Sequence, residues 1–330
     1  MRPAEFVRSA LLALLALWLC GCASQPVAAP NPLPSWTAGP VKSRLLDFVA
    51  AATDPASATW VDPADRIAVV DHDGTLIVEQ PRPVQMDFIF DRIVALAPGH
   101  PEWAGKQPFA AVMQQDWNSL DALGFRGSAP LMDAAQAGLS GEAYAEAAKT
   151  FLENSRDARF GRRYTELVYQ PVRELVALLQ ARDFRVFIVS SGGAEFIRAL
   201  AEPVYGIASE RVIGSRMKTE LREVDGRLEV LRKPGFAGLN VASFKALNID
   251  ALVGRRPVIA IGNSDGDLQM LQYTDTGPAS LVVLLEHDDA QREYDYAQDS
   301  VKVRAMAAKR NWLQVSMARD FLQIFPESAK

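Results

Sequence analysis

Asp71-His72-Asp73-Gly74-Thr75 directly follows the apolar run Ile67-Ala68-Val69-Val70, which is typical of a buried strand. Gly74 allows the backbone to turn here, so two carboxylates stand two residues apart at a strand end. This arrangement suits a carboxylate nucleophile beside a carboxyl acid/base, both near a metal ion. The alternatives are an acidic turn and a calcium loop. An EF-hand loop has Gly at its sixth position and Glu at its twelfth, whereas here Gly74 is fourth and Arg82 is twelfth.

Two later apolar runs also end in polar motifs. Residues 185–189 lead into Ser190-Ser191-Gly192-Gly193, and residues 257–261 lead into Gly262-Asn263-Ser264-Asp265-Gly266-Asp267. Helical patterns separate the strands, which predicts an α/β fold: a doubly wound parallel sheet with helices on both faces. Ligands of such sheets gather at the carboxyl ends of the strands, so we expect the three motifs to form one site.

The stretch between the first two motifs has a helical pattern without a strand-like run. We expect residues 81–170 to form an inserted helical cap domain, in which Ser140 caps a helix. The α/β core then comprises residues 44–80 and 171–330. Within the core, residues 211–232 alternate around Asp225-Gly226, which predicts a hairpin, and we expect helices to fill most of the C-terminal part.

The strand-end residues can be given roles in phosphoryl transfer. Asp71 can attack phosphorus to form an aspartyl-phosphate. Asp73 can protonate the leaving alcohol and then deprotonate the attacking water. The Ser190 hydroxyl can donate to a phosphate oxygen, although a Ser-Gly-Gly turn alone is more often only structural. Positive charge must balance these oxygens, and both Lys245 and Lys233 are candidates for that role.

The third motif offers oxygen ligands on a tight turn. Asn263, Asp265 and Asp267 suit Mg²⁺, which prefers hard oxygen ligands and takes few of them from the protein. An acidic, solvated turn is the alternative.

Together these elements resemble the haloacid dehalogenase superfamily over about residues 64 to 290. The branch they most resemble is the phosphoserine-phosphatase-like one, with a helical C1-type cap. The resemblance implies strand order 5-4-1-2-3, Mg²⁺ dependence and phosphomonoester hydrolysis. It assigns catalysis to Asp71 and Asp73, phosphate binding to Ser190 and Lys245, and metal binding to Asp71, Asp73 (through its backbone carbonyl), Asn263 and Asp267.

The resemblance has one departure. Asn263 stands where the superfamily usually has an acid, so a neutral amide oxygen replaces one charge, and Asp265 or Asp267 would have to compensate. We expect a hydrolase that acts on a small phosphorylated metabolite. The alternatives are a non-catalytic lipoprotein that binds phosphorylated ligands and a phosphotransferase that uses the same aspartyl-phosphate.

The N-terminus has the features of a targeting segment. Basic residues precede an apolar run, residues 10–19, which is too short to span a bilayer comfortably. The run ends in Leu19-Cys20-Gly21-Cys22, which resembles the lipobox of bacterial lipoproteins. The resemblance implies that residues 1–21 are a signal peptide, that Cys22 is lipidated and that Pro/Ala-rich residues 22–43 are a tether. An ordinary secretory signal and an uncleaved anchor are the alternatives.

We therefore expect an envelope protein that faces the periplasm and contacts the membrane only through its lipid. The outer membrane is favoured over the inner because no Asp follows Cys22. Beyond Cys20 and Cys22 the chain has no cysteine, so its folded part has no disulfide and no cysteine nucleophile. The formal net charge of −5 gives no support to nucleic-acid binding.

Overall fold

The computed structural model describes residues 31–327, and Leu33–Lys330 forms one compact unit. The predicted signal peptide, the predicted lipidation site Cys22 and part of the predicted tether lie outside the described residues. The remainder of this subsection concerns the compact unit.

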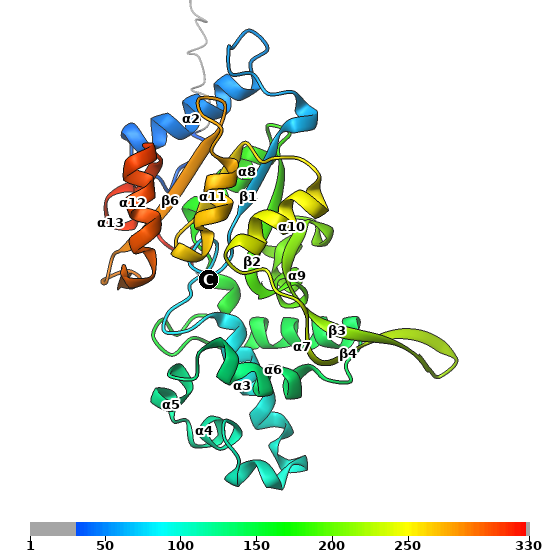
Figure 1. The fold of residues 1–330 in the computed structure, drawn as a ribbon. Coiled ribbons are helices and arrows are strands. Elements are labelled where there is room, and N and C mark those ends of the chain that lie inside the picture. Colours follow the sequence, from blue (N-terminus) through cyan, green and yellow to red (C-terminus); the bar gives the residue numbers. More distant parts are fainter. Residues whose placement is uncertain (1–30, 328–330) are drawn as a thin grey trace, which may run out of the picture. The chain divides into compact units, whose positions relative to one another are not determined.

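A mainly parallel sheet forms the centre of the unit (Figure 1). Its strands follow the order β4-β3-β2-β1-β5-β6-β7, with β8 paired to β6. The parallel strands are β1 (Ile67–Val70), β2 (Arg185–Gly193), β3 (Val212–Val224), β5 (Ile259–Gly262), β6 (Leu281–Asp288) and β8 (Leu313–Ser316). Counted in chain order, the first five have the predicted order 5-4-1-2-3, and the α/β fold class is confirmed.

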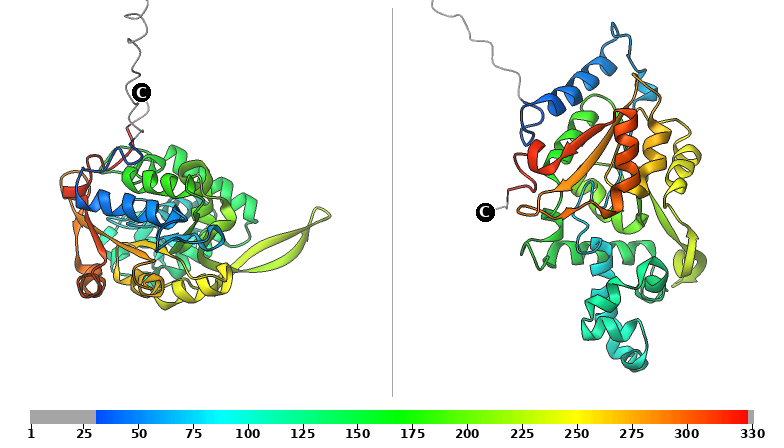
Figure 2. Two further views of the ribbon diagram at one scale, coloured as in Figure 1. Left: turned by 90° about the horizontal axis from the view of Figure 1, so that it is seen from above. Right: turned by 60° about the vertical axis from the view of Figure 1, so that its left-hand side comes forward.

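Helices cover both faces of the sheet because its central strands are apolar on both sides (Figure 2). Ala68 and Val70 of β1 pack in one core cluster, and Val69 packs in the other. The first cluster includes residues of α2 (Pro40–Thr53), α8 (Gln170–Gln180) and α9 (Ala194–Tyr205). The second includes residues of α10 (Ser243–Val253), α11 (Leu268–Thr274) and α12 (Val301–Arg310).

The segment between β1 and β2 is helical, as the sequence predicts. It contains α3 (Val84–Leu96), α4 (Phe109–Gln114), α5 (Trp117–Asp121), α6 (Gly124–Gln136) and α7 (Gly141–Asn154). The Ser140 hydroxyl caps α7 by accepting a hydrogen bond from the Ala143 backbone amide. Side chains of this segment, including Phe88 and Leu131, belong to the same core cluster as β1. Its boundaries as a separate cap domain stay a prediction.

The predicted hairpin is also present. β3 continues past the sheet and pairs with antiparallel β4 (Arg227–Gly238), which gives the long ribbon that projects in Figure 1. Asp225 and Gly226 form its tip with φ of 50° and 75°, the left-handed conformation that a tight hairpin turn requires.

The C-terminal part is less helical than expected. Besides α12 and α13 (Met317–Asp320), it contains β7 (Asp295–Tyr296), which pairs with the end of β6, and β8, which adds a sixth parallel strand. β8 has only four residues, Leu-Gln-Val-Ser, which is too short a run to be distinguished from a helix turn by periodicity.

Candidate active site

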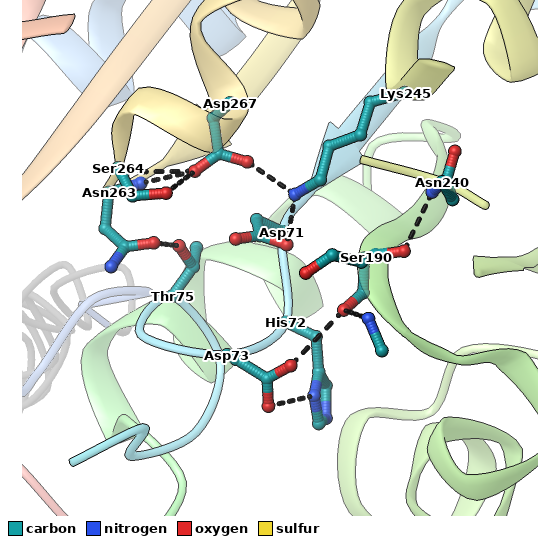
Figure 3. Close-up of polar contacts among 12 residues, drawn as sticks. Asp71, His72, Asp73, Thr75, Ser190, Asn240, Lys245, Asn263, Ser264 and Asp267 are labelled. Carbon is teal, nitrogen blue, oxygen red and sulfur yellow. Dashed lines mark hydrogen bonds and ion pairs between the residues drawn. The ribbon is translucent and has the colours of Figure 1, made fainter. Parts of the chain in front are cut away.

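The three strand-end motifs meet at one edge of the sheet (Figure 3). Asp71 and Asp73 follow β1, Ser190 lies near the end of β2, and Asn263 and Asp267 follow β5. These three strands are adjacent and parallel, so their carboxyl ends lie side by side. The site therefore follows directly from the strand order.

Lys245 joins the first and third motifs. From the first turn of α10, its Nζ lies 2.7 Å from Oδ1 of Asp71 and 2.6 Å from Oδ1 of Asp267. All three side chains are buried. Burial by itself would lower the pKa of Lys245, but the charges of Asp267 and Asp71 raise it above its usual value. The lysine is therefore held as a cation beside the predicted nucleophile.

The Asp71 carboxylate is buried near both a cation, Lys245, and a second carboxylate, Asp267. Burial, and then the charge of Asp267, raise its pKa well above the usual value, although Lys245 opposes them. Its Oδ1 contacts Lys245, while no donor among the described residues contacts its Oδ2. One oxygen is thus fixed, and the other is available to a substrate or a metal ion.

Both oxygens of the Asp267 carboxylate accept hydrogen bonds from protein groups. Its Oδ2 accepts from the backbone amides of Asn263 and Ser264, both at 3.1 Å, while its Oδ1 accepts from Lys245. A Cβ at Gly262 would lie 2.7 Å from Cγ of Asp267, so this close approach requires glycine. These contacts position Lys245, and the role of Asp267 as a metal ligand stays a prediction.

Asp73 lines a cavity that lies between the strand ends and helices α3, α5 and α6. Its Oδ2 accepts from the Ser190 hydroxyl at 3.4 Å, and that hydroxyl in turn accepts from the Gly192 amide at 3.0 Å. Its Oδ1 lies 3.2 Å from Nδ1 of His72, whose ring is buried and reaches Tyr205 on its other side. Asp73 and Ser190 are therefore brought together as predicted, and His72 supports the carboxylate.

Two other predicted candidates lie elsewhere. Lys233 is in the projecting hairpin, half exposed, and pairs with Glu220 at 3.2 Å. Asp265 accepts from the Val303 amide at 2.8 Å, at the start of α12. The structure thus selects Lys245 from the two lysines and gives Asp265 no contact with the site residues.

The donors around Asp71 fit Mg²⁺. Its carboxylate, the backbone carbonyl of Asp73 and the Oδ1 of Asn263 are hard oxygen ligands at the ends of adjacent strands. Among residues 31–327 no group of three or more His, Cys, Asp or Glu side chains could hold a metal ion, so the set depends on the amide and carbonyl oxygens. Two carboxylates, Asp71 and Asp267, contact a single cation, Lys245, and Asp73 adds a further negative charge near Asp71, which leaves negative charge for a divalent ion to balance.

Sequence reasoning missed a buried polar network behind this site. Asn263 receives a hydrogen bond from Thr75 at 3.1 Å and donates to Glu79 at 2.7 Å, and Tyr296 also donates to Glu79 at 2.8 Å. Burial raises the pKa of Glu79. The amide of Asn263 can donate to Glu79, which an aspartate could not do. The contact with Glu79 therefore fixes the orientation of the Asn263 amide, with Nδ2 toward Glu79 and Oδ1 toward Thr75.

His287 holds the first motif from the side of β6. Its Nε2 donates to the carbonyl of Gly74 at 2.7 Å, and its Nδ1 lies 3.0 Å from the Glu293 carboxylate. Glu293 is fully buried and also accepts from Tyr169 at 3.0 Å. No local pattern marks His287, because its partner at Gly74 lies 213 residues away.

We expect His287→Phe to lower the free energy of unfolding by about 3 kcal/mol, because it leaves the buried Glu293 carboxylate and the Gly74 carbonyl without their hydrogen-bond contacts to the imidazole. Urea denaturation of the full-length protein measures the change. His100→Phe is a matched control, since His100 forms a similar pair with Glu102 at 3.1 Å but is exposed; we expect a change below about 1 kcal/mol there. Equal effects of the two substitutions would contradict the structural role of His287.

The protein is an α/β protein with carboxylates at the carboxyl ends of its parallel strands. The family model described as haloacid dehalogenase-like hydrolase matches residues 68–272, more than half of the chain. The chain belongs to this family, which confirms the resemblance found in the sequence and the prediction of an enzyme. No curated protein matches the chain at the level of sequence.

Solved structures also resemble the chain. A conserved protein of unknown function from Anaerococcus prevotii has a TM-score of 0.54 at 13% identity, with 83% of this chain and 91% of that chain covered. This similarity supports the fold. A probable phosphoserine phosphatase from Vibrio cholerae has a TM-score of 0.40 at 18% identity, covering 79% and 63%. A phosphoserine phosphohydrolase-like protein from Francisella tularensis has a TM-score of 0.39 at 18% identity, with 72% of this chain and 92% of that chain covered.

Proposed function

We propose that this protein is a Mg²⁺-dependent phosphomonoester hydrolase that acts through an aspartyl-phosphate on Asp71. One observation carries the proposal. The buried Asp71 carboxylate is fixed through one oxygen by Lys245 at 2.7 Å, two residues before Asp73, a second carboxyl group that lies on the cavity side. Family membership supports a hydrolase, and the paired carboxylates support phosphoryl transfer.

The first chemical step forms the covalent intermediate. Oδ2 of Asp71 attacks phosphorus, and the bond between phosphorus and the alcohol oxygen breaks. Asp73, in its protonated form, gives its proton to that oxygen, so the alcohol leaves neutral. The Ser190 hydroxyl and the Lys245 ammonium donate to the phosphoryl oxygens and stabilise the charge that develops on them.

The second step regenerates the enzyme. Asp73 is now a carboxylate and takes a proton from water, which attacks phosphorus and breaks its bond to Asp71. Inorganic phosphate leaves, and both aspartates return to their initial states. Asp71, the Asp73 carbonyl and Asn263 would hold Mg²⁺, and the bound ion would supply positive charge that balances the phosphate beside the Asp71 carboxylate.

Removal of Mg²⁺ tests the metal and the activity together. We expect the full-length protein to hydrolyse a generic phosphomonoester, to lose at least about 100-fold of that activity with EDTA, and to recover it with excess Mg²⁺. Full activity after chelation would contradict the metal role. Tight binding of phosphate esters without turnover would favour the non-catalytic alternative.

We also propose that the protein is anchored to the envelope through a lipid on Cys22 and faces the periplasm, in the outer rather than the inner membrane. The support is the sequence Leu19-Cys20-Gly21-Cys22 after a short apolar run. Among residues 31–327, no helix is long and apolar enough to cross a membrane.

Cys22→Ala tests this anchor. We expect the variant to leave the detergent-soluble membrane fraction and to lack the mass of the lipid on its N-terminal peptide, while Cys20→Ala keeps both. Retention of Cys22→Ala in the membrane fraction would contradict lipid anchoring at this residue.

A further inference from the structure

A cavity of about 470 Å³ opens beside the proposed catalytic centre. Asp73 and Ser191-Gly192-Gly193 form the side that faces the strand ends, while α3, α5 and α6 contribute the opposite side. Its volume lies within the range of small-molecule sites, about 300–1,000 Å³. A phosphate held at Asp71 would therefore direct its ester group toward this space.

The cavity wall is mainly apolar. Three methionines, aromatic rings and aliphatic side chains contribute to it from both sides, among them Met86, Phe90, Leu120, Met132, Met217 and Val241. Methionine side chains are flexible and adapt to apolar ligands of different shapes. Burying an apolar ligand group against such a wall is favourable, whereas burying an unpaired charge there costs free energy.

The charged groups of the wall are already paired. Among the lining residues whose side chains the structure describes, which excludes residues 125 and 126, Arg82 is the one cation. It contacts Asp87 at 3.1 Å and Asp121 at 3.2 Å, and it lies over the ring of Trp117. Glu195 lies 3.9 Å from Arg232. Among these described side chains, a substrate carboxylate would find no cation that is not shared with carboxylates.

The cavity wall next to Asp73 contains two glycines, Gly192 and Gly193. A Cβ at Gly192 would lie 3.3 Å from Oδ2 of Asp73, and one at Gly193 would lie 2.7 Å from Nε2 of Gln85. Gln85 is itself held, since its Oε1 accepts from the Gly193 amide at 2.8 Å. Glycine at these two positions therefore lets the β2 backbone approach Asp73 and Gln85 closely in this part of the wall.

We propose that this cavity binds the alcohol part of the substrate and that this part is an uncharged, mainly apolar aliphatic or aromatic group. The inference rests on the proposed phosphatase function and narrows its substrate class. Amino-acid phosphates, which carry a carboxylate and an ammonium group, are poor substrates on this account.

Two phosphomonoesters of nearly equal leaving-group basicity test the proposal on the full-length protein with Mg²⁺. Hexyl phosphate and the phosphate ester of 6-hydroxyhexanoate differ chiefly at the far end, a methyl group against a carboxylate. We expect kcat/KM to be at least about 50-fold higher for hexyl phosphate, and to rise about threefold per methylene group from ethyl to hexyl phosphate. Equal values, or a preference for the carboxylate ester, would overturn the inference and leave the phosphatase function intact.

Absence of turnover on every ester would instead overturn the proposed function, and the inference with it. Met132→Lys adds an unpaired cation to the wall, and we expect it to reduce the preference for hexyl phosphate at least tenfold. Met306→Lys on α12 is the matched control: Met306 is also partly buried but does not line the cavity, and its variant should keep the wild-type preference. An unchanged preference in a folded, active Met132→Lys variant would contradict the assignment of this wall.

Discussion

Asp71→Asn is expected to lower kcat for phosphomonoester hydrolysis by at least about 10⁴-fold, because an amide cannot act as the nucleophile that forms the aspartyl-phosphate. The fold should remain intact. The substitution removes one of two carboxylates that compete for Lys245, and burial together with Asp267 already raises the pKa of Asp71. We therefore expect the free energy of unfolding to stay equal or to increase, as urea denaturation can measure.

Asp265→Asn provides the matched control in the same site region. Asp265 contacts the Val303 amide and none of the proposed catalytic groups, so its variant should keep kcat within a few-fold of wild type. If Asp71→Asn retained more than a tenth of the activity, Asp71 would not be the nucleophile.

Lys245→Met is expected to affect both activity and stability. The variant leaves Asp71 and Asp267 buried without the cation that contacts both of them. Removing one partner of a buried ion pair costs about 3–5 kcal/mol, and loss of the phosphate contact should lower kcat about 10³-fold. Lys233→Met removes an exposed pair and should cost less than about 1 kcal/mol with activity unchanged.

The stability loss in Lys245→Met should depend on pH. Without the cation, burial and the charge of Asp267 raise the pKa of Asp71 in the folded state further above its value in the unfolded chain. Such a carboxyl favours the folded state while it is protonated, and this support is lost as the pH rises through its folded pKa. The loss should therefore be smaller near pH 5 than near pH 8. A loss no greater than that of Lys233→Met, or one that grows as the pH falls, would contradict the paired state of Lys245.

The residue pattern was sufficient to predict a parallel α/β sheet and the three strand-end motifs, for a physical reason, whereas the strand order came from the family resemblance. A buried parallel strand is a short apolar run, and a polar residue directly after it must lie at the carboxyl edge of the sheet. The residue pattern alone left both Lys245 and Lys233 as candidates, and the family resemblance favoured Lys245. The fold shows that the segment of Lys245 is the one that returns to that edge.

The supporting network could not be predicted in the same way. Glu79, His287 and Tyr296 each contact the site through long-range pairs that join β6, β7 and the β1 turn. No residue spacing encodes such pairs. The resemblance assigned metal binding to Asp267, which stays a prediction, and only the fold shows that its two oxygens are held by Lys245 and by backbone amides.

The most direct test of the central claim is to trap the phosphorylated enzyme. The full-length protein is mixed with Mg²⁺ and a ³²P-labelled phosphomonoester, quenched in acid within one turnover, digested and analysed by peptide mass and radioactivity. We predict a hydroxylamine-sensitive phosphoryl group on Asp71, absent from Asp71→Asn. Turnover of the ester with label on another residue, or with no hydroxylamine-sensitive label at all, would contradict the account.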